Sequence, residues 1–240
     1  MLPNGETRRR ESSSRRFQYI KRIFKWRHMD FEFALWQMFY LCANPRKVYR
    51  NFQYHKQTKD FWARDDPAFL VLLAAWLLGS SIFYAIVLPL NVARFFQFFL
   101  WTVFGECIGI GLIVAALLWL FTNRVLKVGN EKVEWAYAFD IHLNAYFPTL
   151  IILHMIQVFL LHKSSHNTTL VMYLGNFLWL LALSYYCYIT FLGYSSLRFL
   201  RHTVIFIYPI ALFLLLFALT PAHKLSCSSL ARDFYTEITK

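Results

Sequence analysis

Residues 49–90 read YRNFQYHKQTKDFWARDDPAFLVLLAAWLLGSSIFYAIVLPL, and the character of the chain changes at Pro67. The part up to Asp66 is crowded with charged side chains of both signs, whereas residues 68–90 carry none. An uncharged apolar run of about 20 residues is long enough to cross a bilayer as a helix. Pro67 suits the first position of that helix, and Asp65 or Asp66 suits its cap. The stretch therefore predicts a transmembrane helix that begins at a water boundary.

The composition is that of a membrane protein, with 58% hydrophobic and only 16% charged residues. A soluble domain has roughly 45–50% apolar and about 25% charged residues. Four further apolar runs are long enough to span a bilayer: residues 95–122, 143–161, 170–194 and 203–221. The run 31–43 is too short and contains Glu32, so it predicts a packed or interfacial helix. The expected fold is an all-α bundle of five transmembrane helices, preceded by cytosolic amphipathic or interfacial helices.

The chain is expected to divide into a short tail, a cytosolic segment, a bundle and a second tail. Residues 1–14 are polar and predict a disordered cytosolic tail. Residues 15–67 predict a basic, aromatic-rich helical segment in the cytosol or at the interface. Residues 68–221 would form the five-span transmembrane bundle, and residues 222–240 a lumenal tail.

Lys and Arg residues are distributed unevenly between the two sides of such a bundle. Segment 1–67 holds 15 of the 25 Lys and Arg residues, and the second and fourth connections, on the same side, add three and two. The other side holds the remaining five. Because positive charge favours the cytosolic side, we expect a cytosolic N-terminus and, after five spans, a lumenal C-terminus.

The segment before residue 30 has a basic amphipathic pattern. Phe17, Ile20 and Phe24 share one helical face. The basic residues of the segment include Arg15, Arg16, Lys21, Arg22, Lys25 and Arg27. Such a helix fits an anionic bilayer surface, although basic residues interleaved with aromatics can also hold single-stranded RNA. We expect the membrane-surface role, because no recognisable RNA-binding module accompanies the segment.

Residues 49–66 mix both charge signs with many aromatic side chains. The charges could pair with one another as a solvated collar on the bilayer, or the segment could form a docking face for a cytosolic partner. In the docking interpretation, aromatic and Arg side chains are the anchors, because these residue types are favoured at interface hot spots. The candidate anchors are Tyr49, Arg50, Phe52, Tyr54, Phe61, Trp62 and Arg64. The residue pattern alone leaves both interpretations open.

A few polar and small residues lie inside the predicted spans. Glu106 is near the middle of the second span, where an acid costs roughly 2.5–3.5 kcal/mol, so it should face the bundle or be protonated. Gly105 and Gly109 form a GxxxG pair, extended by Gly111, which predicts close helix packing. The other polar members could join helices by hydrogen bonds: His154, Gln157 and Asn176. We expect packing contacts from this set.

A small transporter or a lipid-modifying enzyme is the alternative for these polar groups. It would be built around Glu106, Asp140, His142 and His154. The four cysteines are scattered, with no CxxC pair and no zinc-ligand spacing. The chain contains no nucleophile elbow, glycine-rich phosphate loop or HExxH helix. We therefore expect no catalytic residues, no cofactor and no metal site.

Four longer motifs resemble those of the Unc-fifty family. They are MDFEFALWQM (29–38), NPRKVYRNFQYHKQTKDFWARDDPAF (44–69), VEWAYAFDIHLNAYFP (133–148) and YITFLGYSSL (188–197). The likeness covers about residues 15–215. It implies a multi-pass protein of the Golgi membrane, with a cytosolic N-terminus and a role in vesicle traffic.

The same resemblance implies partners but no catalytic residues. The implied partners are an exchange factor for Arf GTPases and receptor cargo, nicotinic acetylcholine receptors in particular. This favours the docking interpretation of residues 49–66. RNA binding at the inner nuclear membrane, also implied by the resemblance, is the first alternative. The expectation is an adaptor in membrane traffic rather than an enzyme.

Overall fold

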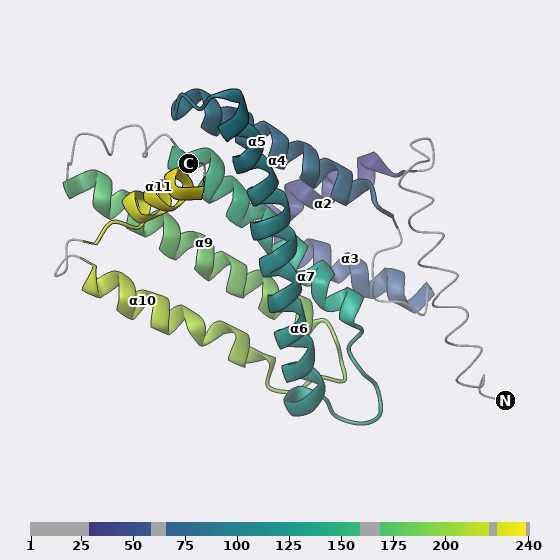
Figure 1. Ribbon diagram of the computed structural model, residues 1–240. Coiled ribbons are helices and arrows are strands. Elements are labelled where there is room, and N and C mark those ends of the chain that lie inside the picture. Colours follow the sequence, from purple (N-terminus) through teal and green to yellow (C-terminus); the bar gives the residue numbers. More distant parts are fainter. Residues whose placement is uncertain (1–28, 59–65, 159–168, 221–224, 239–240) are drawn as a thin grey trace.

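The computed structural model describes residues 29–58, 66–158, 169–220 and 225–238, which are mostly helical (Figure 1). In chain order the helices are α2 (Phe31–Ala43), α3 (Pro45–Thr58), α4 (Ala68–Val87), α5 (Val92–Leu100), η2 (Trp101–Ile110), α6 (Gly111–Phe121), η3 (Thr122–Leu126), α7 (Trp135–Leu150), η4 (Ile151–Ile156), α9 (Thr169–Ser195), η5 (Thr203–Ile207), α10 (Pro209–Leu219) and α11 (Cys227–Ile238). Within these ranges the only β-type pairing is one isolated bridge. The all-α prediction is confirmed.

In the described parts of the chain, four helical rods are long and apolar enough to cross a membrane. They are Ala68–Val87, Val92–Leu126, Trp135–Ile156 and Thr169–Ser195. The prediction of a multi-pass membrane protein is therefore confirmed. The fifth predicted span forms a shorter apolar helix over Thr203–Leu219, which lies along α9 in Figure 1. Its crossing of the bilayer stays a prediction.

Asp66 fixes the start of the first span. One carboxylate oxygen accepts a hydrogen bond from the backbone N–H of Ala68 at 3.0 Å. The other accepts from the backbone N–H of Asp30 at 2.6 Å. Asp30 in turn caps α2 by accepting from the N–H of Phe33 at 2.9 Å. The N-cap residue of α4 is Pro67, which corrects the prediction of Asp65 or Asp66 at the cap and of Pro67 at the first helical position. The Asp66 carboxylate instead joins the starts of α2 and α4.

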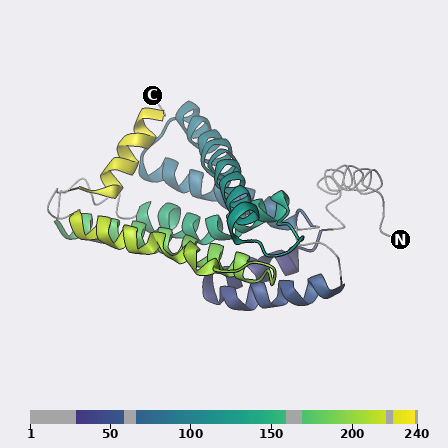
Figure 2. The same cartoon turned by 90° about the horizontal axis from the view of Figure 1, so that it is seen from below.

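The second and fourth connections meet at one end of the bundle (Figures 1 and 2). The N–H of Val128 donates to the carbonyl of Phe199 at 2.9 Å, and the N–H of Arg201 donates to the carbonyl of Leu126 at 3.0 Å. α2, α3 and the start of α4 lie towards the same end. We call it the basic end, after its described basic residues Arg46, Lys47, Arg50, Arg124, Lys127, Lys132, Arg198 and Arg201. The described parts of the three segments that the charge count placed on one side therefore lie together.

Three stretches of the rods are π-helical: η2, η3 and η4. The π-helix accounts for well under 1% of residues in proteins generally, and its turns are frequent at functional sites. Pro148 lies inside α7, where it lacks the N–H that would continue the α-helical ladder, three residues before η4 begins. Two of the π-helical stretches, η2 and η4, carry Glu106 and His154, whose side chains lie inside the bundle.

Candidate functional site

α2 and the start of α3 are fixed to α9 by polar contacts. The hydroxyl of Tyr185 donates to the carbonyl oxygens of Leu41 and Cys42, at 2.8 and 3.0 Å, where α2 ends. The Nε of Arg46 donates to the hydroxyl of Tyr188 at 2.8 Å. α2 also packs on α4 and α7 through buried side chains. This layer is therefore part of the bundle rather than a loose attachment to the bilayer.

The described docking anchors of α3 differ in burial. Tyr49 is only 4% exposed, and its ring packs edge-on against Phe52 with centroids 6.0 Å apart. Tyr49 therefore packs the core, which corrects its prediction as an exposed anchor. Arg50 is exposed. The side chains of the other predicted contacts lie outside the described residues: Tyr54, Phe61, Trp62 and Arg64 of the docking set, and Arg15, Arg16, Lys21, Arg22, Lys25 and Arg27 of the membrane-surface or RNA set.

Four exposed side chains of α2 and α3 define what we call the α2–α3 surface. Leu35 and Phe39 are one turn apart on α2 and are 53% and 65% exposed. Arg46 and Arg50 are one turn apart on α3 and are also exposed. Leu35 and Phe39 could not be recognised as exposed from the sequence, because apolar residues at that spacing predict a buried face equally well. The surface combines apolar and basic groups.

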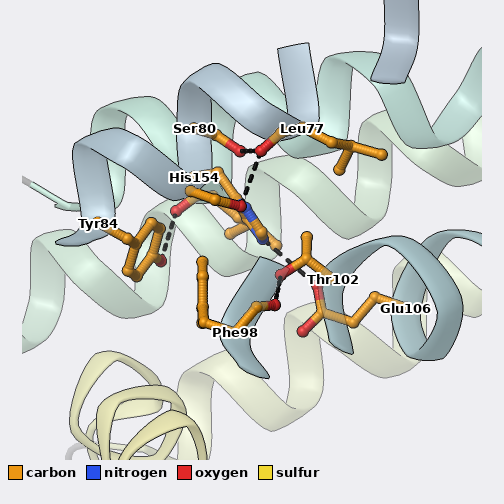
Figure 3. A network of polar contacts seen from close by, with 9 residues as sticks. Leu77, Ser80, Tyr84, Phe98, Thr102, Glu106 and His154 are labelled. Atoms are coloured by element: carbon orange, nitrogen blue, oxygen red, sulfur yellow. Dashed lines mark hydrogen bonds and ion pairs between the residues drawn. The ribbon is translucent and has the colours of Figure 1, made fainter. Parts of the chain in front are cut away.

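A carboxyl–imidazole pair lies inside the bundle, between η2 and η4 (Figure 3). The Oε2 of Glu106 is 3.4 Å from the Nε2 of His154, and the two side chains are 14% and 5% exposed. The inward position removes the acid from lipid, as the cost of an unpaired acid predicts. The ring of Tyr84 packs edge-on to His154 with centroids 5.3 Å apart. The pair joins the second and third rods.

α11 covers this pair at the end of the bundle opposite to the basic end. The ring of Tyr235 packs edge-on against Tyr84 and Phe98, with centroids 5.6 and 5.1 Å apart. Burial first, and then the negative charge of Glu106, raise the pKa of the Tyr235 phenol well above its usual value. The phenol therefore stays protonated and hydrogen-bonds to the Glu106 carboxylate. This carboxylate contacts both a neighbouring rod and the C-terminal helix.

Asn176 holds the start of α11 on α9. Its Nδ2 donates to the carbonyl of Leu225 at 2.8 Å, and its Oδ1 accepts from the N–H of Cys227 at 2.7 Å. The Nε2 of Gln157 donates to the Oγ of Ser228 at 3.1 Å. Asn176 does join helices, but its partner is the C-terminal segment rather than another span.

The four groups of the transporter or enzyme alternative do not form one site. Both ring nitrogens of His142 are used in packing: Nδ1 is 2.8 Å from the hydroxyl of Tyr186, and Nε2 is 3.1 Å from the carbonyl oxygen of Cys107. His142 and Asp140 precede His154 on one helical rod by 12 and 14 residues, a separation of about 18–21 Å. Within the described residues, no group of three His, Cys, Asp or Glu side chains could hold a metal ion.

Gly111, rather than the GxxxG pair, lets two rods approach closely. A Cβ at Gly111 would lie 2.5 Å from ring atoms of His142 on α7. Gly105 lies against the ring of Trp101 on its own rod, and Gly109 lies against the backbone of its own π-helical turn. The prediction of Gly105 and Gly109 as a packing pair between helices is therefore wrong.

Comparison with known proteins gives the family. The sequence matches the UNC-50 family over residues 19–236. The chain belongs to the UNC-50 family. It is 49% identical to the bovine and human proteins named "Protein unc-50 homolog", over 239 residues that cover 98% of this chain and 92% of each relative. It is 52% identical to "Protein unc-50" of Caenorhabditis elegans over 220 residues, 91% of this chain and 73% of that one. No solved structure matches.

The UNC-50 match extends beyond the residues expected from the motifs. The motifs indicated a likeness over about residues 15–215. The family match instead continues to residue 236 and so includes nearly all of α11. The contacts of Asn176 and Tyr235 give a physical reason, because they make α11 part of the packed bundle.

Proposed function

We propose that the protein is a multi-pass adaptor of the Golgi membrane in vesicle-mediated protein transport. It recruits an exchange factor for Arf GTPases and supports the trafficking or assembly of cell-surface receptors such as nicotinic acetylcholine receptors. In this proposal the basic end faces the cytosol and the C-terminal helix lies on the lumenal side. Membership of the UNC-50 family and the excess of Lys and Arg at the basic end support the proposal.

The α2–α3 surface is the observation that carries this proposal. Three hydrogen bonds to Tyr185 and Tyr188 fix the layer on the bundle. Phe39 and Arg50 nevertheless remain exposed. A surface that is already ordered loses little conformational entropy when a partner docks. Arg and aromatic side chains are the residue types that dominate binding energy at interfaces.

The buried polar groups favour an adaptor over an enzyme. Glu106 pairs with His154, and both nitrogens of His142 contact other rods. These groups are occupied by contacts between helices. An adaptor needs them only for stability, so the exposed cytosolic surface is where its specificity would reside.

Recruitment of the exchange factor to Golgi membranes tests the proposal. Phe39→Ala and Arg50→Ala should each weaken binding by roughly thirtyfold if they are hot spots. Arg94→Ala at the opposite end is the matched control and should recruit normally. Recruitment is scored at equal abundance of the protein in the Golgi. Normal recruitment by both variants would contradict the assignment of docking to this surface.

Tyr49→Ala separates packing from docking. Since Tyr49 is buried, its truncation should lower the abundance of the folded protein. The remaining folded protein should recruit the exchange factor as well as the native chain does. A selective loss of recruitment at normal abundance would instead show that Tyr49 contributes to docking.

A further inference from the structure

The second connection is a loop closed at its base by side-chain hydrogen bonds. The Oδ1 of Asn123 accepts from the N–H of Val133 at 2.8 Å, and its Nδ2 donates to the carbonyl of Val133 at 3.0 Å. The indole Nε1 of Trp119 donates to the same carbonyl at 2.9 Å. Arg124 and Lys132 are the next residues inward from this closure, so they stand at the two sides of the loop base.

The tip of this loop is fixed to the fourth connection. Lys127 and Leu200 form an antiparallel bridge, flanked by backbone hydrogen bonds of 2.9 and 3.0 Å. Paired backbones of this kind lie roughly 5 Å apart. Arg198 and Arg201, on either side of Leu200, therefore lie close to Lys127. The chain holds basic residues from two distant parts of the sequence in one place.

These two connections carry more positive than negative charge. Their basic residues, which we call the basic loop pair, are Arg124, Lys127, Lys132, Arg198 and Arg201. The acids of the same connections are Glu131 and Glu134. In the described part of the chain, none of the five basic side chains makes an ion pair with a carboxylate. Like charges held together repel, so an anionic ligand would lower the free energy of this arrangement.

The surroundings of the basic loop pair are apolar and exposed. Val125 and Val128 lie in the second connection and Trp135 follows it; they are 63%, 44% and 40% exposed. Tyr208, which follows the fourth connection, is 65% exposed. Aromatic side chains at the ends of membrane spans lie at the level of lipid headgroups. A ligand here would meet fixed cations and hydrocarbon side by side.

We infer that the basic loop pair binds the phosphorylated headgroup of an anionic membrane lipid. An inositol lipid with phosphates on its ring fits best, because several phosphates can engage cations from both connections at once. Arg side chains bind phosphate in a bidentate manner, and Lys binds it as a point charge. The flanking apolar side chains suit the acyl chains of a lipid rather than a free anion. This site shares no residue with the α2–α3 surface, so loss of lipid binding and loss of partner docking can be measured independently.

The test uses the full chain in nanodiscs of neutral phosphatidylcholine. The probes are a phosphatidylinositol bisphosphate and, for comparison, phosphatidylserine, with retained lipid counted by native mass spectrometry. The variant is the triple change Lys127→Gln, Arg198→Gln and Arg201→Gln. We expect it to weaken binding of the inositol lipid about fivefold for each charge, or roughly a hundredfold in total. The double change Arg94→Gln and Arg232→Gln at the other end is the control and should bind normally.

Protein integrity is checked by thermal unfolding, and the triple change to Lys or Arg (Lys127→Arg, Arg198→Lys, Arg201→Lys) should restore most of the binding. Equal binding by the native chain and the triple Gln variant would overturn the inference. So would an equal loss in the control at the opposite end. A soluble inositol polyphosphate that binds as tightly as the lipid would overturn the lipid assignment, as would preferential binding of an acidic peptide.

Discussion

Replacing Asn176 by Ala should release the C-terminal helix from the bundle. The change removes two hydrogen bonds, to the carbonyl of Leu225 and from the N–H of Cys227. The second bond caps the start of α11, and loss of a helix cap costs about 1 kcal/mol. The first is an ordinary hydrogen bond, also worth about 1 kcal/mol. The sum of about 2 kcal/mol corresponds to roughly a thirtyfold shift towards undocked α11.

Hydrogen exchange of residues 227–238 in reconstituted protein measures this shift. Amides of α11 should exchange roughly thirtyfold faster in Asn176→Ala, while amides of α7 and α4 keep their protection. Asn176→Asp keeps an acceptor for Cys227 but loses the donor to Leu225, so it should show an intermediate rate. Asp233→Asn on the exposed side of α11 is the control. If Asn176→Ala leaves the protection of α11 unchanged, the contacts of Asn176 do not hold this helix, and the reasoning is refuted.

Three other perturbations test the fold and its orientation. Gly111→Ala places a methyl group against His142 and should lower the free energy of unfolding by about 1–3 kcal/mol, measured by thermal unfolding. Gly79→Ala, where a Cβ would meet nothing within 4 Å, should be tolerated. Equal melting temperatures of the two variants would contradict the close approach of α6 and α7. Glu106→Ala should destabilise the bundle by about 3 kcal/mol in denaturant titration, because His154 and Tyr235 lose their shared partner. Glu106→Gln should retain most of this stability and should recruit the exchange factor normally. Tags before Arg8 and after Lys240 should fall on opposite sides of the Golgi membrane in protease-protection assays, and protection of both tags together would exclude five spans.

Local features of this chain could be predicted from the sequence, because each depends on nearby residues. The apolar run after Pro67 defined α4, and Asp66 was correctly expected at its boundary. The short run 31–43 was expected to pack or lie at the interface rather than span, and it forms α2 over those same residues. Glu106 was expected to face the bundle, since an unpaired acid is costly in lipid.

Features that depend on tertiary contacts could not be predicted in the same way. Tyr49 lies in a segment rich in charge, yet tertiary packing buries it. The GxxxG pattern does not indicate which glycine faces a neighbouring rod, and it is Gly111, rather than Gly105 and Gly109, that makes the close approach. α11 is too short to be recognised as a span, and its docking involves Asn176, which is distant in sequence. Nothing local in the sequence indicates that Lys127 and Leu200 pair.

The π-helical stretch η2 makes the length of the second rod critical. Before it, Phe98 faces Tyr84 and Tyr235; after it, Gly111 faces His142 on α7. In an α-helix each residue advances the side-chain direction by about 100°. A single-residue insertion or deletion within η2 would therefore turn one half of the rod away from its neighbours while leaving composition and hydropathy almost unchanged. Substitutions along the lipid-facing side of this rod should be tolerated, whereas a change in its residue count should not.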